Sequence, residues 1–184
     1  MKRALIVIFL IIYLLIPNYI SNAMLLPKSI LELYVESDLV IIGKIADLNE
    51  MVQERKTLYI IEVERYLKNP QAAKIIIAIG KGAKSSELRT SIDKIFEKGD
   101  RVLLYLNVKS ENYTISPYSF NVGSLDIESK FIPSPLKLWQ AGIDTKEIVC
   151  KGDLVLVTKA VNNSPACIKP TSVQRILNIG WARS

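Results

Sequence analysis

A long apolar segment near the start of the chain constrains the fold more than any other feature. Residues 37–48 read Ser-Asp-Leu-Val-Ile-Ile-Gly-Lys-Ile-Ala-Asp-Leu, and Gly43 is the single glycine within this segment. An internal glycine lets a long strand bend where a side chain would collide with a neighbour. A long strand with one such bend is typical of a small closed barrel, so this segment predicts the first strand of a barrel.

Four further segments have the pattern of strands. Residues 57–67 alternate, with apolar side chains on one face and glutamates on the other, as in a half-buried antiparallel strand. Shorter strands are expected at 74–79, 101–108 and 113–115. Short strands separated by turns predict a small barrel or sandwich. The polar segment 81–98 is expected to form a short helix or a loop that covers the barrel.

A short helix is expected before the first strand. Ser29 and Glu32 have the spacing of a capping box, in which each side chain satisfies a free backbone N–H of the first turn. One apolar face of this helix is expected to pack against the barrel. Its members are Ile30, Leu31, Tyr34 and Val35.

Residues 1–23 have the three parts of a signal peptide. Lys2 and Arg3 precede an apolar run at 4–16, and Ser21-Asn22-Ala23 supplies the small residues that a signal peptidase reads. We expect cleavage before Met24. The alternative is an uncleaved membrane anchor formed by residues 4–23. Under either interpretation the protein lies outside the cell or on its surface.

Charge and histidine content bear on the class of function. The net charge is +6, but residues 24–135 carry 15 basic and 15 acidic side chains, and residues 136–184 carry seven basic and three acidic ones. So dilute a surplus does not form the basic stripe of a nucleic-acid-binding protein. The chain has no histidine, which removes the commonest general base and zinc ligand. We expect no enzyme activity, no catalytic or metal-binding residues, no cofactor and no nucleic-acid partner.

The C-terminal residues 133–184 are expected to form a small separate module. Cys150 and Cys167 flank a predicted β-hairpin, and a helix at 171–179 follows, with Trp181 as an expected core anchor. Two cysteines in an exported chain are expected to form a disulfide, and closing a loop of this length contributes roughly 3 kcal/mol of stability. No Cys-x-x-Cys motif supports a metal site or a redox site.

Asn112 is a candidate site of N-glycosylation. It begins an Asn-Tyr-Thr acceptor sequence for N-glycosylation at an expected hairpin turn. The segment 80–85 lacks the spacing of a phosphate-binding loop, and the Ser-x-x-Lys patterns at 91–94 and 134–137 lack the companion motifs of acyl-transferases. The carboxylates near Asp93 and Asp126 lack the ligand pattern of a calcium loop.

Three segments together resemble the netrin-like module, the OB-type barrel found in tissue inhibitors of metalloproteinases. They are Asp38–Ile45, the strand that ends in Tyr66-Leu67-Lys68, and Phe96–Leu106. The resemblance covers residues 29–125 and implies an OB-like antiparallel barrel. Those inhibitors engage the protease zinc through an N-terminal cysteine, and the expected mature start, Met24-Leu25-Leu26-Pro27, has none. The resemblance therefore implies the fold without the inhibitory mechanism.

The C-terminal residues also resemble a two-cysteine module of exported archaeal proteins of unassigned function, on the residues around Cys150, Pro165, Cys167 and Trp181. The chain is thus expected to be mainly β with short helices: a signal peptide or anchor at 1–23, an OB-like barrel at 24–132 and a disulfide-linked hairpin and helix at 133–184. We expect a non-enzymatic protein that binds a protein or cell-envelope partner. The alternative is a membrane-anchored protease-inhibitor-like or envelope assembly factor that acts through loops such as 81–98.

Overall fold

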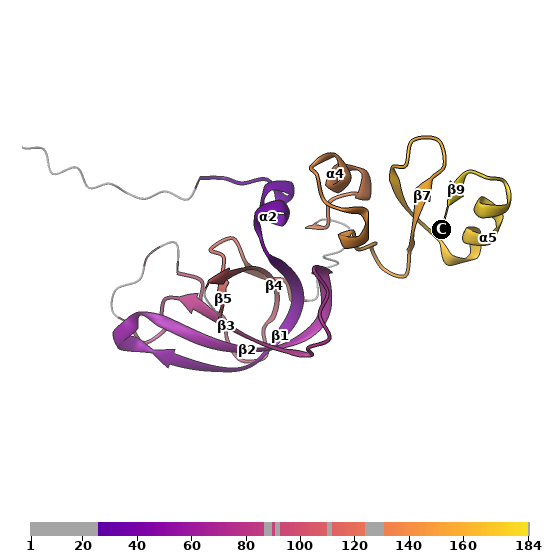
Figure 1. Cartoon of the computed structure of the whole chain (residues 1–184). Coiled ribbons are helices and arrows are strands. Elements are labelled where there is room, and N and C mark those ends of the chain that lie inside the picture. Colours follow the sequence, from indigo (N-terminus) through magenta and orange to yellow (C-terminus); the bar gives the residue numbers. More distant parts are fainter. Residues whose placement is uncertain (1–25, 87–89, 91–92, 110–111, 124–130, 184) are drawn as a thin grey trace, which may run out of the picture.

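A closed β-barrel forms the larger part of the computed structural model, and a smaller sheet with short helices lies beside it (Figure 1). The structure describes residues 26–86, 90, 93–109, 112–123 and 131–183. The expected signal peptide lies outside these residues. Among the described residues, no helix has the length and apolar character needed to cross a bilayer.

The barrel has five strands, and its closure depends on β1 having two partners. The sheet order is β1-β2-β3-β5-β4, and β4 pairs again with β1. β3 and β5 pair in parallel, whereas the other pairs are antiparallel. This arrangement confirms the expected small OB-like barrel. The strands are β1 (Leu39–Met51), β2 (Lys56–Lys68), β3 (Ile75–Lys81), β4 (Arg101–Lys109) and β5 (Asn112–Ile115).

Two short elements of the barrel region were not expected from the sequence. A 3-10 turn, η1 (Val52–Glu54), connects β1 to β2. A two-residue strand, β6 (Phe120–Asn121), pairs with β4 at Leu103 and Val102. Neither has a pattern of its own, because each is too short to show a periodicity.

The apolar run of β1 is explained by burial on both faces of the strand. Leu39 and Ile41 point into the barrel, where they join one apolar cluster. Val40 and Ile42 point outward into a second cluster, which helices cover. β4 behaves in the same way, because alternate residues of a strand face opposite sides. One side of the barrel is therefore covered and has apolar residues on both faces of its strands.

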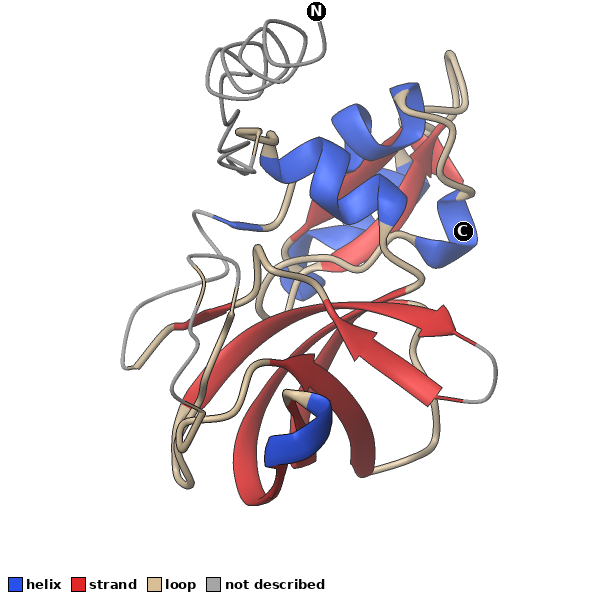
Figure 2. Ribbon diagram, turned by 90° about the vertical axis from the view of Figure 1, so that its left-hand side faces the viewer, coloured by secondary structure: helices blue, strands red, loops and turns tan. Residues whose placement is uncertain are grey.

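Helix α2 (Ile30–Glu36) covers that side of the barrel (Figures 1 and 2). It begins with the expected capping box of Ser29 and Glu32. Its buried residues are Leu33 and Tyr34, whereas Val35 is exposed, so the expected apolar face was wrong in part. The helix has only seven residues, and its orientation places Leu33 against the barrel in the position expected for Val35.

Lys68 fastens the C-terminal end of α2 to the barrel. Its ammonium donates to the carbonyl oxygens of Tyr34, Val35 and Ser37, at 2.9, 3.0 and 2.6 Å. Cations stabilise helix C-termini because the last carbonyl groups have no partners within the helix. The Lys68 side chain is buried, and this burial lowers the pKa of its ammonium group.

The described part of segment 81–98 is a loop that covers one end of the barrel. Phe96 is buried against Tyr59, with the two ring centroids 5.7 Å apart in an edge-to-face arrangement. The backbone N–H of Phe96 donates to the Tyr59 hydroxyl at 3.2 Å. The covering-loop interpretation is confirmed for these residues.

The C-terminal residues form a second, three-stranded sheet with order β8-β7-β9. The hairpin of β7 and β8 and helix α5 lie close to their expected positions, and a disulfide joins Cys150 to Cys167, with Cα atoms 5.7 Å apart. This disulfide was predicted and is confirmed. The elements are α4 (Pro135–Gln140), η2 (Thr145–Glu147), β7 (Val155–Lys159), β8 (Pro165–Ile168), α5 (Pro170–Asn178) and β9 (Ala182–Arg183).

Trp181 does not anchor the core as expected. Its side chain is 39% exposed, and the Lys159 ammonium lies 5.5 Å from its ring centroid. The neighbouring Ala182 is buried instead and pairs with Lys159. Trp181 lies in the bend just before β9 (Ala182–Arg183), so the strand places Ala182 inward and leaves Trp181 at the surface.

Residues on both sides of the expected boundary at 132/133 share one apolar cluster. Leu138 of α4 and Ile148 pack with Leu103 and Tyr105 of the barrel. The guanidinium of Arg65 donates to the carbonyl oxygen of Cys150 at 2.6 Å. Residues 133–150 therefore help to cover the barrel, and division into two domains stays a prediction.

Candidate functional site

The outer face of β2 and β3 carries apolar side chains that the structure leaves uncovered. Ile75 is 61% exposed and Ile77 is 51% exposed, and both lie on β3. Ile60, Leu58 and Ile79 beside them are half-buried. We call these five residues the isoleucine face.

The register of the two strands shows that the isoleucine face is continuous. Ile60 lies opposite Ile77, and Leu58 lies opposite Ile79, in the antiparallel pair of β2 and β3. Side chains directly opposite each other in such a pair are close neighbours on one face. Scattered exposed apolar residues are ordinary, but contiguous apolar patches mark interaction sites. The isoleucine face is therefore a candidate binding surface.

A groove begins where the isoleucine face ends. It has a volume of about 530 Å³ and is lined by the ends of β3, β4 and β5 and the start of β2. Three lysines lie along it, Lys56, Lys81 and Lys109, all exposed. Ile79 lines this groove and also belongs to the isoleucine face. We call this cavity the lysine groove.

The polar lining of the lysine groove consists of neutral and cationic groups. Asn107, Asn112, Thr114 and Ser116 add amide and hydroxyl groups beside the lysines. No acidic residue is among the described residues that line it. The Lys56 ammonium is 3.0 Å from the Glu54 carboxylate, in a solvent-exposed pair just outside the groove. The groove is therefore positively charged and offers hydrogen-bond donors along its length.

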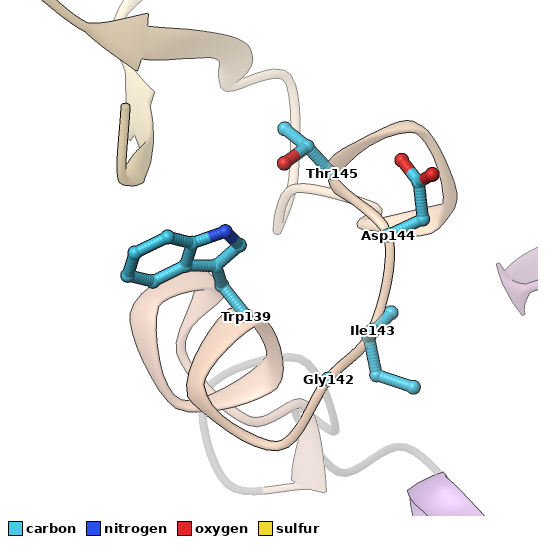
Figure 3. A pocket seen from close by; sticks show the side chains of 5 residues that line it. All are labelled: Trp139, Gly142, Ile143, Asp144 and Thr145. Carbon is cyan, nitrogen blue, oxygen red and sulfur yellow. The ribbon is translucent and has the colours of Figure 1, made fainter. Parts of the chain in front are cut away.

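A smaller cavity of about 320 Å³ lies beside α4, next to the indole of Trp139 (Figure 3). The backbone N–H of Gly142 donates to the Trp139 carbonyl at 3.0 Å, and that of Ile143 donates to the Leu138 carbonyl at 3.1 Å. The Asp144 carboxylate accepts from the backbone N–H of Lys146 at 2.9 Å. These contacts belong to the turn that ends α4 and to the cap that begins η2, so the cavity is explained by local structure.

The predicted disulfide and the predicted glycosylation site lie in different parts of the structure. Cys150 and Cys167 form the disulfide of the second sheet. Asn112 is exposed at the start of β5 and lines the lysine groove. Its glycosylation stays a prediction.

The motifs that were set aside have structural explanations where the structure describes them. Ser134 caps α4, accepting from the backbone N–H of Lys137 at 3.4 Å, which explains the second Ser-x-x-Lys pattern. Asp100 accepts from the backbone N–H of Glu97, and Glu97 pairs with Lys84 at 2.6 Å. This ion pair with Lys84 holds the pKa of Glu97 below its ordinary value. Asp126 and Ser91 lie outside the described residues.

Within the described part of the chain, no group of three or more cysteine, aspartate or glutamate residues is arranged to hold a metal ion. Asp93 illustrates this, because its carboxylate accepts from the backbone N–H of Thr90 at 2.8 Å and lies 3.8 Å from the Arg55 guanidinium. The carboxylate oxygens of Asp93 are thus already engaged in contacts that stabilise the loop.

Sequence reasoning missed both the isoleucine face and the lysine groove. The signal for the first was present: three consecutive isoleucines, Ile75 to Ile77, cannot all point into one barrel interior. The groove had no such signal, because its lysines come from three strands and only the closed barrel brings them together.

No protein-family model matches the chain, and no curated protein matches it significantly.

Proposed function

We propose that the protein is an exported, non-enzymatic binding protein whose isoleucine face docks against an aliphatic surface of a partner protein. The observation that carries this proposal is the exposure of Ile75 and Ile77 on a rigid strand of the barrel. By contrast, residues of α2 and α4 cover the apolar outer face of β1 and β4. An uncovered apolar face on a rigid sheet favours association, because burying it removes apolar surface from water.

Export is supported by two features that belong to different parts of the chain. The disulfide between Cys150 and Cys167 is of a kind that persists in oxidising compartments. The basic and apolar N-terminal residues have the composition of a signal peptide or anchor. The location that we propose is the cell surface or the extracellular space.

The netrin-like resemblance remains part of this proposal. The closed OB-like barrel supports it at the level of fold. Proteins with one fold carry many functions, so the activity is argued from the exposed surface and not from the resemblance.

Photo-crosslinking tests the proposal in the native host. A benzoylphenylalanine placed at Ile77 should form a discrete covalent adduct with one cell-surface protein, identified by mass spectrometry. The same group at Val161, which is 91% exposed in the turn between β7 and β8, is the matched control and should give no such adduct. The purified partner should then bind the Ile75→Lys variant at least tenfold more weakly than the unmodified protein, because a charge is placed in the apolar contact.

Two outcomes would overturn the proposal. One is the same adducts from Ile77 and Val161, which would show crosslinking by chance encounter. The other is a dimer in sedimentation experiments that Ile75→Lys dissociates, which would make a second copy of the chain the occupant. Thermal unfolding of Ile75→Lys establishes that the variant is folded.

A further inference from the structure

We propose that the lysine groove recognises carboxylate groups of the partner segment that docks on the isoleucine face. The inference rests on the proposed function and specifies the chemistry of the partner. The partner segment combines aliphatic side chains, for the isoleucine face, with aspartate or glutamate side chains, for the groove.

The first argument is continuity between the two surfaces. Ile75, Ile77, Ile79 and Lys81 alternate along β3 and point to the same outer side. Ile79 belongs to both surfaces, because it is a member of the isoleucine face and also lines the lysine groove. At about 3.3 Å per residue, the distance along β3 from Ile75 to Lys81 is roughly 20 Å. An extended segment of about seven residues covers both surfaces.

The second argument is charge. Lys81 and Lys109 border the groove from different strands, and neither forms an ion pair with another described residue. Two ammonium groups facing one cavity repel each other, and an anionic ligand relieves this repulsion. Long lysine side chains contribute charge without fixed geometry, which suits carboxylates at several positions along a flexible segment.

The third argument is the neutral lining. Ser116 carries a hydroxyl group and Asn107 carries an amide along the strand ends of the groove, whereas the Thr114 hydroxyl already donates to the Asn107 backbone carbonyl at 3.1 Å. The Ser116 hydroxyl and the Asn107 amide can donate hydrogen bonds to carboxylate oxygens or to the backbone carbonyls of an extended segment. The combination of lysines, neutral donors and an aliphatic border therefore fits an acidic peptide better than a free inorganic anion.

Fluorescence anisotropy with a synthetic probe tests this inference. The probe is a fluorescein-labelled peptide, Leu-Val-Leu-Gly-Glu-Asp-Glu, and its control is Leu-Val-Leu-Gly-Gln-Asn-Gln. We expect the acidic probe to bind at least tenfold more tightly at low salt and to lose most of this preference at 1 M salt, where charges are screened beyond about 3 Å. Intact mass should first show that Asn112 carries no glycan, since Asn112 lines the groove.

Matched variants locate the interaction. The double variant Lys81→Gln with Lys109→Gln should bind both peptides equally. The control double variant, Lys44→Gln with Lys146→Gln, removes the same charge from exposed lysines elsewhere and should keep the tenfold preference. Equal loss in both double variants would show a general charge effect and overturn the inference.

Other outcomes separate this inference from the proposed function. If the Ile77 adduct forms but the acidic probe shows no preference, the partner docks without carboxylate recognition and only the inference fails. If a single-stranded oligothymidylate binds the groove more tightly than the peptide, and Lys81→Gln weakens it, the ligand class is wrong. If neither the adduct nor probe binding is observed, both proposals fail.

Discussion

Lys68 illustrates how one buried side chain can hold a helix against a barrel. Its ammonium donates to three carbonyl oxygens at the end of α2. The sequence pattern at this position suggested only the end of a strand. The role depends on contacts between residues more than thirty positions apart, which periodicity does not reveal.

Replacing Lys68 with methionine should lower the free energy of unfolding by about 1–3 kcal/mol, because buried carbonyl groups lose their donors. The matched control, Lys44→Met, changes an exposed lysine of β1 and should shift stability by no more than about 0.5 kcal/mol. Urea denaturation at pH 7 measures both. An unchanged midpoint for Lys68→Met would contradict the anchoring role.

The lowered pKa of Lys68 also predicts a pH dependence for this comparison. Burial lowers the pKa of Lys68 in the folded protein, so between that value and about 10.5 the unfolded chain holds a proton that the folded one has released. The contribution of Lys68 to stability therefore increases as pH rises through this window. The difference between the unmodified protein and Lys68→Met should widen accordingly.

At the scale of the element, Gly43 lies in the part of β1 that pairs on both sides, with β2 and with β4. A Cβ atom at this position would lie 2.7 Å from the carbonyl oxygen of Glu62 and 2.7 Å from a methyl group of Ile61. The register of β1 and β2 also shifts between Ile42 and Gly43. The glycine thus permits a close approach at an irregular point of the pair.

Gly43→Ala should destabilise the barrel by roughly 1–3 kcal/mol, because both contacts are shorter than packing allows and one involves backbone. Lys44→Ala, at the neighbouring exposed position, should have little effect. Thermal unfolding followed by far-UV circular dichroism compares the two. Equal stability of the two variants would mean that β1 shifts without cost at this site.

The strands that could be predicted are those whose sequence pattern of apolar and polar residues matches the burial of their two faces. β1 to β5 lie within a few residues of their expected positions, because alternation in 57–67 and double-sided burial in 101–108 leave clear patterns. β6 and β9 were missed, since each has two residues and exists only through its partner strand. For the same reason the lysine groove was beyond sequence reasoning: it is a product of strand order.

At the scale of the whole molecule, the disulfide stabilises the smaller sheet next to its contact with the barrel. Cys150 forms the disulfide with Cys167, and its backbone carbonyl oxygen accepts a hydrogen bond from the Arg65 guanidinium. The bridge therefore orders both the hairpin and the backbone that meets β2.

Replacing Cys150 and Cys167 with alanine should cost roughly 3 kcal/mol in the stability of the hairpin, following the entropy of the loop that the bridge closes. Hydrogen exchange should accelerate in β7 and β8 while the barrel strands stay protected. Val161→Ala, in the exposed hairpin turn, is the control and should leave exchange unchanged. Protection of the hairpin in the cysteine variant would show that packing alone orders it.

The double pairing of β1 also has a consequence for the order in which the chain becomes structured. β1 begins at Leu39, but its second partner, β4, begins at Arg101, and β5 ends only at Ile115. A chain that emerges from the ribosome or a translocation channel N-terminus first therefore keeps its most apolar strand incompletely paired until most of the barrel sequence has emerged. Contacts so distant in sequence form slowly. A barrel built in this way therefore closes only after most of its sequence has emerged.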